Sequence, residues 1–262
     1  MGENNSSTTR VAPVFDQLVA ADPTGAGWLD GLVALGSRFP SVRLREAHLR
    51  LVPEHGRRWG SSEVALAAPL GLLEHLVQNI TEEQVAANKD SEPVFGHRMA
   101  LARRDPSTIA AALSFLRSGN RGRTWFVLEG ESRPDAVLET SDTIIVVEGK
   151  RTERSCTSKT KWMGVRSQLI RHMDAAAEAY PAKQVLGLLV VEGDGDASAT
   201  EPSAHWLEQC GMQVAPAMLD ASLPHRSPAQ RQHLADGMLG VTTWQRVCAM
   251  NNLRWPPFPD VS

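Results

Sequence analysis

The chain has 262 residues, of which 42% are hydrophobic, and this is enough apolar material for one large domain or two smaller ones. Its formal net charge of −3 at pH 7 argues against a protein that coats nucleic acid through overall charge, although a local basic groove remains compatible with it. The three cysteines have no zinc-like spacing and no apolar run reaches transmembrane length, so we expect a reduced, cytoplasmic protein with no membrane part.

Residues 1–60 are expected to form an amino-terminal helical extension. Short helices are predicted over 11–21 and 28–37, because the dipeptides Asp22-Pro23 and Phe39-Pro40 interrupt the apolar pattern after each of them.

A group of helices is predicted next. The first spans 61–80, with apolar residues at helical spacing on one face: Leu66, Leu70, Leu73, Val77 and Ile80. Thr81 with Gln84 forms a capping-box pattern that starts a second helix, and Asp105-Pro106 opens a third over 107–117.

Strands are predicted over 125–128, 135–139 and 143–148, because apolar and β-branched residues dominate there. A helix over about 160–180 and a fourth strand over 185–191 follow, and this order predicts a right-handed parallel connection. Residues 194–262 are expected to form a carboxy-terminal helical extension, with helices over 202–210, 228–239 and 241–250.

The second and third strands are predicted to form a hairpin with charged residues at its open end. With Ser141-Asp142 as the loop, Asp135 faces Glu148, their side chains share one side of the sheet, and Lys150 points to that side too. Opposed carboxylates repel, so neutralising one is expected to stabilise the metal-free protein, and a hard cation with oxygen ligands would remove the repulsion.

The hairpin pattern therefore predicts a metal site. An ordinary hairpin with charged ends is the alternative, and a bulge would shift the register, since Ser-Asp is not a favoured two-residue turn.

Pro134-Asp135 opens the second strand and Glu148-Gly149-Lys150 closes the third, and this arrangement resembles the PD-(D/E)XK nuclease superfamily over residues 61–193. The resemblance implies an α/β fold with a restriction-endonuclease-like mixed β-sheet core (αβββαβ) flanked by helices. It also implies Mg²⁺- or Mn²⁺-dependent endonucleolytic cleavage of DNA, in defence, restriction or repair. Cleavage of RNA or of a nucleotide remains open, and a catalytically inactive nucleic-acid-binding or regulatory module of the same fold is the alternative.

Residue roles follow from the resemblance. Asp135, Glu148 and the carbonyl of Gly149 would ligate the metal, and Lys150 would position or activate water and stabilise the developing oxyanion. Many members add an acid from an amino-terminal helix. Residues 107–117 contain none, so Glu74, or else Glu63, is the candidate, and each of them also fits a half-exposed helix flank.

Other features near the motif suggest contacts with nucleic acid. Related nucleases carry Gln-x-x-x-Tyr on the next helix. Gln168 matches this pattern as a candidate site residue, whereas His172 replaces the tyrosine, and an exposed glutamine is an equal alternative.

A local excess of positive charge suits a phosphate backbone, although surface charge alone also explains it: Arg151, Arg154, Lys159, Lys161, Arg166 and Arg171. Trp162 fits either a base-stacking platform or a core position. Cutting both strands of a duplex needs two sites, which is compatible with a homodimer.

Overall fold

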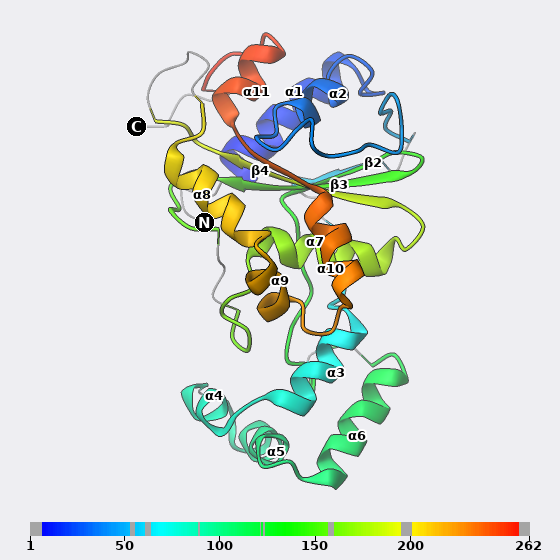
Figure 1. Cartoon of the computed structure of the whole chain (residues 1–262), viewed down its shortest axis with the longest axis vertical. Helices are drawn as coiled ribbons and strands as arrows, with labels where there is room; N and C mark the ends of the chain where they lie inside the picture. Colours follow the sequence, from blue (N-terminus) through cyan, green and yellow to red (C-terminus); the bar gives the residue numbers. More distant parts are fainter. Residues whose placement is uncertain are drawn as a thin grey trace.

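The computed structural model describes residues 7–52, 56–60, 64–88, 90–120, 122, 124–156, 160–194 and 201–256. These residues form one five-stranded sheet with helices on both faces, and a further group of helices at one end of the molecule (Figure 1). The protein is therefore of the mixed α/β class, as the sequence predicted.

The sheet has the strand order β1-β2-β3-β4-β5. The strands are β1 (Arg57–Trp59), β2 (Ala136–Glu139), β3 (Thr143–Lys150), β4 (Gln184–Val191) and β5 (Met238–Thr243). The pairs β1–β2 and β2–β3 are antiparallel, whereas β3–β4 and β4–β5 are parallel. The predicted parallel arrangement of the third and fourth strands of the core is confirmed.

The register of the predicted hairpin is also confirmed. Ala136 lies opposite Val147, and the Thr140 amide donates to the Thr143 carbonyl at 2.9 Å, so Ser141-Asp142 is the loop. Continuing this register by one residue brings Asp135 to the level of Glu148.

Two assignments from the sequence, one of a strand and one of a helix, were wrong. Residues 125–128 form no strand, and their apolar character instead serves the core of the helical group, where Phe126 and Leu128 are buried. The outer partner of β2 is β1. Residues 238–243 form β5 rather than helix, and all six are buried in the sheet. The sheet thus takes strands from within 1–60 and 194–262 as well as from 61–193.

Helices from the two ends of the chain cover one face of the sheet (Figure 1). They are α1 (Ala12–Ala21), preceded by a π-helical turn η1 (Ser7–Val11), α2 (Leu29–Ala34) and α11 (Trp244–Met250). Phe15, Leu32 and Trp244 pack there against Leu138 and Val147, and all five side chains are fully buried.

The opposite face is covered by α7 (Gln168–Ala179), α8 (Ala204–Gln213), α9 (Pro216–Ser222) and α10 (Pro228–Asp236). Met173 of α7 packs on Val146 and Val185 of the sheet in this second core. The predicted helix over 160–180 begins only at Gln168, because Ser167 caps it by accepting from the Ile170 amide.

Four helices form a separate group between β1 and β2: α3 (Leu70–Asn79), α4 (Glu82–Ala87), α5 (Glu92–Ala102) and α6 (Pro106–Arg117). They have their own core. The capping box of Thr81 with Gln84 and the start of α6 at Pro106 are confirmed. The helix predicted over 61–80 begins after Pro69, because Leu66 instead pairs with Ser132 in an isolated β-bridge.

Trp162 is only 5% exposed and belongs to the core of this helical group, so the core interpretation of this residue holds rather than base stacking. The cysteines Cys156, Cys210 and Cys248 are buried and unpaired. No helix within the described ranges is both long and apolar enough to cross a membrane.

A buried ionic network fixes α7 to the carboxy-terminal helices. The fully buried carboxylate of Asp174 accepts from Arg166 Nη2 and Arg226 Nε, both at 2.7 Å, and lies 3.1 Å from His225 Nε2. Arg166 also donates to the Ser222 carbonyl at 3.0 Å. Burial raises the pKa of Asp174, but the charge of Arg166 and the contacts with His225 and Arg226 outweigh burial and hold the pKa well below its usual range.

Replacing Asp174 by asparagine should therefore destabilise the protein. The change leaves buried cationic groups without their counter-charge, at a cost of about 3 kcal/mol or more in the free energy of unfolding, measured by urea denaturation at pH 7. Asp220, which is 67% exposed and pairs with Arg231, supplies the control: Asp220→Asn should change stability by less than about 0.5 kcal/mol. Equal effects of the two changes would contradict this role of the network.

The pH dependence of that difference is a second readout. A carboxylate with a lowered folded-state pKa stabilises above its unfolded-state pKa, about 3.9, and loses this contribution as pH falls toward the folded-state value. The stability gap between wild type and Asp174→Asn should therefore shrink below about pH 4.

Candidate active site

The end of the hairpin brings Asp135 and β3 together. Asp135 lies just before β2, and its Oδ2 accepts from the Gly149 amide at 2.8 Å. The amide and carbonyl of one strand residue point to the same edge, so the Gly149 carbonyl also faces Asp135. A Cβ at position 149 would lie 2.7 Å from Val11 Cγ2 and 3.0 Å from Trp244 Cζ2. Glycine therefore allows these two side chains to pack closely against the backbone of β3.

Glu148 is a buried carboxylate with partners on both oxygens. Its side chain is 2% exposed, its Oε1 accepts from Lys150 Nζ at 2.8 Å, and its Oε2 lies 2.9 Å from His172 Nε2. Burial raises the pKa of Glu148, but His172 and Lys150 more than offset burial, and the net pKa lies below its usual value. Lys150 and His172 thus compensate the charge of Glu148, which the sequence suggested would repel that of Asp135.

Lys150 connects three parts of the site. Its Nζ donates to Glu148 and also to Oε1 of Gln168, at 2.8 Å. Burial lowers the pKa of Lys150, but the charges of Glu148, Glu153 and Asp135 raise it by more. The net pKa therefore lies above its usual value, and this ammonium stays protonated at neutral pH. Gln168 is the first residue of α7, and the structure brings this candidate to the site.

His172 lies one helical turn after Gln168, and sequence reasoning noted it only as a departure from a pattern. A carboxylate can only accept, so His172 Nε2 donates to Glu148, and the other ring nitrogen, Nδ1, forms a hydrogen bond with the Ser132 hydroxyl. Ser132 was missed, because only the β-bridge with Leu66 places it beside α7 and no local pattern marks that bridge.

The series Ser132, His172 and Glu148 has the residue types of a nucleophilic triad, but it cannot act as one. The three side chains are 1%, 2% and 2% exposed, so no substrate can reach the Ser132 hydroxyl. Their arrangement instead holds the Glu148 carboxylate in one orientation.

The third acid expected from a helix is not where the sequence suggested. Glu74 lies on α3 and accepts from Arg117 Nε of α6 at 2.7 Å, within the separate helical group. The prediction that Glu74 joins the metal ligands is wrong, because this ion pair uses its carboxylate elsewhere. Glu63 lies outside the described residues. Among the described residues, no group of three or more histidine, cysteine, aspartate or glutamate side chains is arranged to hold a metal ion.

Two of the proposed phosphate-binding residues have structural roles instead. Arg166 is fully buried in the Asp174 network, so the prediction that it contacts phosphate is wrong. Arg171 donates to the carbonyls of Gly130 and Glu131 at 3.0 and 2.8 Å. Its guanidinium thus ties α7 to the segment that leads to Asp135.

The other basic candidates lie nearer to solvent. Arg151 is half-buried with its Nε 3.5 Å from Glu192, whereas the Arg154 side chain is exposed. Lys161 is half-exposed, lies 3.1 Å from Asp90, and lines a cavity of about 360 Å³ together with Arg98 and Arg171. Lys159 lies outside the described residues. Arg154 and Lys161 are therefore the best-placed described candidates for contact with phosphate.

No family model matches the chain, and no match was found among curated proteins or among solved structures. A functional assignment therefore rests on the geometry of the residues themselves.

The ion pair between Glu148 and Lys150 should be measurable in the metal-free protein. Glu148→Gln and Lys150→Met each leave one buried charge without its main partner, and each should cost about 3 kcal/mol in the free energy of unfolding. The double variant should be more stable than the sum of the two losses implies, with a coupling of about 1–3 kcal/mol in urea denaturation. Additive losses, or stabilisation by Glu148→Gln as simple repulsion would give, would contradict the pairing.

Proposed function

We propose that the protein is a metal-dependent nuclease of the PD-(D/E)XK kind, which hydrolyses phosphodiester bonds. The observation that carries the proposal lies at one end of the β2–β3 hairpin: Asp135 accepts from the amide of Gly149, and the residues on either side of Gly149, Glu148 and Lys150, pair with each other. Gln168 contacts Lys150 there. The antiparallel strands β1, β2 and β3, followed by the helix α7 and the parallel strand β4, also support the proposal, because the expected core has three strands, a helix and a further strand in this order.

The oxygen donors present fit Mg²⁺ or Mn²⁺. Asp135, Glu148 and the carbonyl of Gly149 would hold the ion, since hard divalent cations choose carboxylate and carbonyl oxygens. Glu148 can offer an oxygen only if Lys150 releases it. Lys150 can do so because its Nζ keeps Gln168 as an acceptor. Such an ion, when bound, lowers the pKa of water and neutralises charge at the phosphate.

The remaining side chains have defined tasks in this proposal. The ammonium of Lys150, once it leaves Glu148, stabilises the negative charge that develops on the attacked phosphate. Gln168 keeps that ammonium at the site. His172, oriented by Ser132, holds the second oxygen of Glu148 and so keeps the carboxylate in one orientation.

The proposed substrate is DNA, cut at internal positions, in a cytoplasmic role such as defence, restriction or repair. Arg154 and Lys161 are the proposed contacts to its phosphates. A homodimer would supply the two sites that cleavage of both strands needs.

Removal of either carboxylate tests the site. Asp135→Asn and Glu148→Gln should abolish Mg²⁺-dependent nicking of supercoiled plasmid, because each takes away an ionised oxygen ligand. Glu74→Gln is the matched control, since Glu74 pairs with Arg117 and should leave the rate within about twofold. Cleavage that survives both site changes would remove the basis of the assignment, provided that folding is verified by circular dichroism.

Lys150 separates chemistry from binding. Lys150→Ala should lower the single-turnover cleavage rate by about 100-fold or more, in the range seen when an electrostatic stabiliser is lost. DNA affinity measured in Ca²⁺ should change little. Arg154→Ala and Lys161→Ala should instead weaken binding, each reducing the slope of log affinity against log salt by about one unit. A Lys150→Ala variant with weaker binding but an intact bound-state rate would make Lys150 a groove residue.

One observation favours a second candidate, a catalytically inactive nucleic-acid-binding or regulatory module. Both oxygens of Glu148 are already engaged, and no described helix supplies a third acid. Thermal melting discriminates the two. For the nuclease, Mg²⁺ or Mn²⁺ should raise the Tm of wild type but not of Glu148→Gln, as linkage requires. If the protein is an inactive module, it should bind DNA, and its Tm should be the same in the presence and absence of these ions.

A further inference from the structure

A groove lies at the end of the sheet opposite to the candidate active site. It consists of two cavities, each of about 440 Å³, which share Arg45, Val185 and His233 as lining residues. Gln184 and Val185 are the first two residues of β4 and Gly237 precedes β5, so the groove lies at the amino ends of these parallel strands, whereas Lys150 is the last residue of β3. We call these two cavities the amino-end groove.

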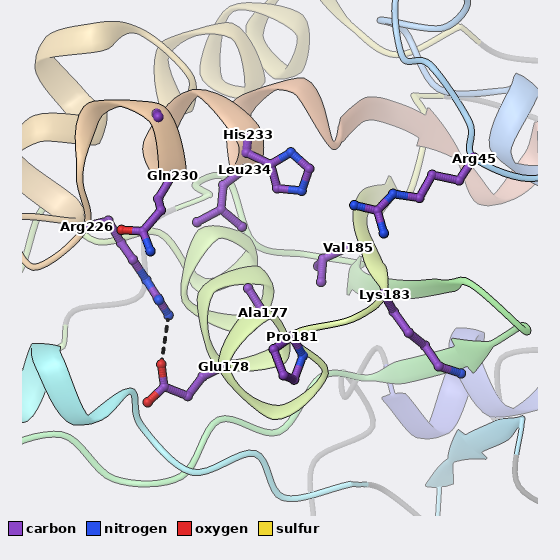
Figure 2. Close-up of a pocket in the computed structure, with 11 residues that line it drawn as sticks. Arg45, Ala177, Glu178, Pro181, Lys183, Val185, Arg226, Gln230, His233 and Leu234 are labelled. Atoms are coloured by element: carbon purple, nitrogen blue, oxygen red, sulfur yellow. Dashed lines mark hydrogen bonds and ion pairs between the residues drawn. The ribbon is translucent and has the colours of Figure 1, made fainter.

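The amino-end groove has more basic than acidic lining residues, because Glu178 and Asp236 are its only described acids. Lys183 lies 2.7 Å from Glu139, and Arg226 pairs with Asp174 and Glu178. In contrast, Arg43, Arg45 and His233 form no ion pair with any described residue. Figure 2 shows the guanidinium of Arg45 and the ring of His233 directed into the same space above Val185, with Lys183 extending away from it.

A buried glutamine fixes the two unpaired arginines at the rim. Gln184 is 8% exposed, its Oε1 accepts from the Arg45 amide at 2.9 Å, and its Nε2 donates to the Arg43 carbonyl at 2.7 Å. The Arg45 guanidinium also donates to the Ala182 carbonyl at 3.0 Å. The backbone that carries both arginines is thus tied to the start of β4, and the Arg45 guanidinium is held there as well.

The first cavity of the groove adds an apolar wall beside this charge. Ala177, Pro181, Val185 and Leu234 line it, and Gln230 lies at its edge, as Figure 2 shows. Its volume lies in the range of small-molecule sites, in which a few polar groups orient a ligand against apolar side chains. An anionic group beside a flat, weakly polar body is the ligand that matches these two parts.

We propose that the amino-end groove binds a nucleoside phosphate. The phosphate lies against Arg43, Arg45 and His233, where paired hydrogen bonds from guanidinium groups suit its oxygens. The base and sugar lie against Ala177, Pro181 and Leu234. This site shares no residue with the hairpin end, so the proposal of nucleotide binding does not depend on the proposed nuclease activity.

Isothermal titration calorimetry of the full chain with nucleoside 5′-monophosphates tests the site. The four ribonucleotides are titrated one by one, with adenosine and inorganic phosphate as the two halves of the ligand. At least one nucleotide should bind saturably, and about tenfold or more tighter than either half. Arg45→Ala should weaken this binding about tenfold or more, as expected for loss of a charge-assisted hydrogen bond, and His233→Ala should weaken it as well.

Arg103→Ala is the control, because Arg103 is 65% exposed on the helical group and pairs with Glu82. It should leave the affinity unchanged. The proposal is overturned if no nucleotide binds at millimolar concentration, if inorganic phosphate binds as tightly as the nucleotides, or if Arg45→Ala and Arg103→Ala have equal effects. A Glu148→Gln protein should bind the nucleotide normally, which separates this site from the proposed active site.

Discussion

A carboxylate buried at the end of a β-strand is the constraint around which the candidate active site is organised. Glu148 is nearly inaccessible to water, so its charge must be compensated by protein groups. Lys150 provides the opposite charge from the same strand, and His172 provides a donor from α7. Each of these partners is in turn held by another residue, Lys150 by Gln168 and His172 by Ser132. The position of α7 against β3 is therefore part of the electrostatics of the site.

The same helix carries the second buried carboxylate. Asp174 lies two residues beyond His172 and binds Arg166 and Arg226, which connect α7 to the segments around α9 and α10. One end of α7 thus orients the site, and its middle anchors the helices that cover this face of the sheet. The ion pair that stabilises the charge of Glu148 also limits its access to a metal ion, because the ion can bind this carboxylate only after Lys150 has moved.

The central hairpin could be predicted because its information is local. The β-branched residues of 143–147 favour a strand, and the register placed Asp135, Glu148 and Lys150 together before any contact was known. Gln168 followed from its place on the next helix. The strands β1 and β5 were not predicted, since β1 has only three residues and β5 is recognisable only from its pairing with β4.

Long-range pairing also explains the errors among the charged residues. In the sequence, Arg166 and Glu74 cannot be distinguished from residues that face a substrate. In the structure, Arg166 pairs with Asp174 and Glu74 pairs with Arg117. Ser132 reaches His172 only through its bridge with Leu66. A single sequence shows which residues carry charge, but the partners that neutralise them are fixed by packing between distant segments.

The most direct test of the proposed metal site is anomalous X-ray diffraction from crystals that contain Mn²⁺. If Asp135 and Glu148 hold a metal ion, an anomalous peak should lie between their carboxylates, close to the Gly149 carbonyl, with Lys150 Nζ moved away from Glu148 and still in contact with Gln168. A structure with Mn²⁺ bound elsewhere, or with no Mn²⁺ and the Lys150–Glu148 pair intact at saturating metal, would contradict it.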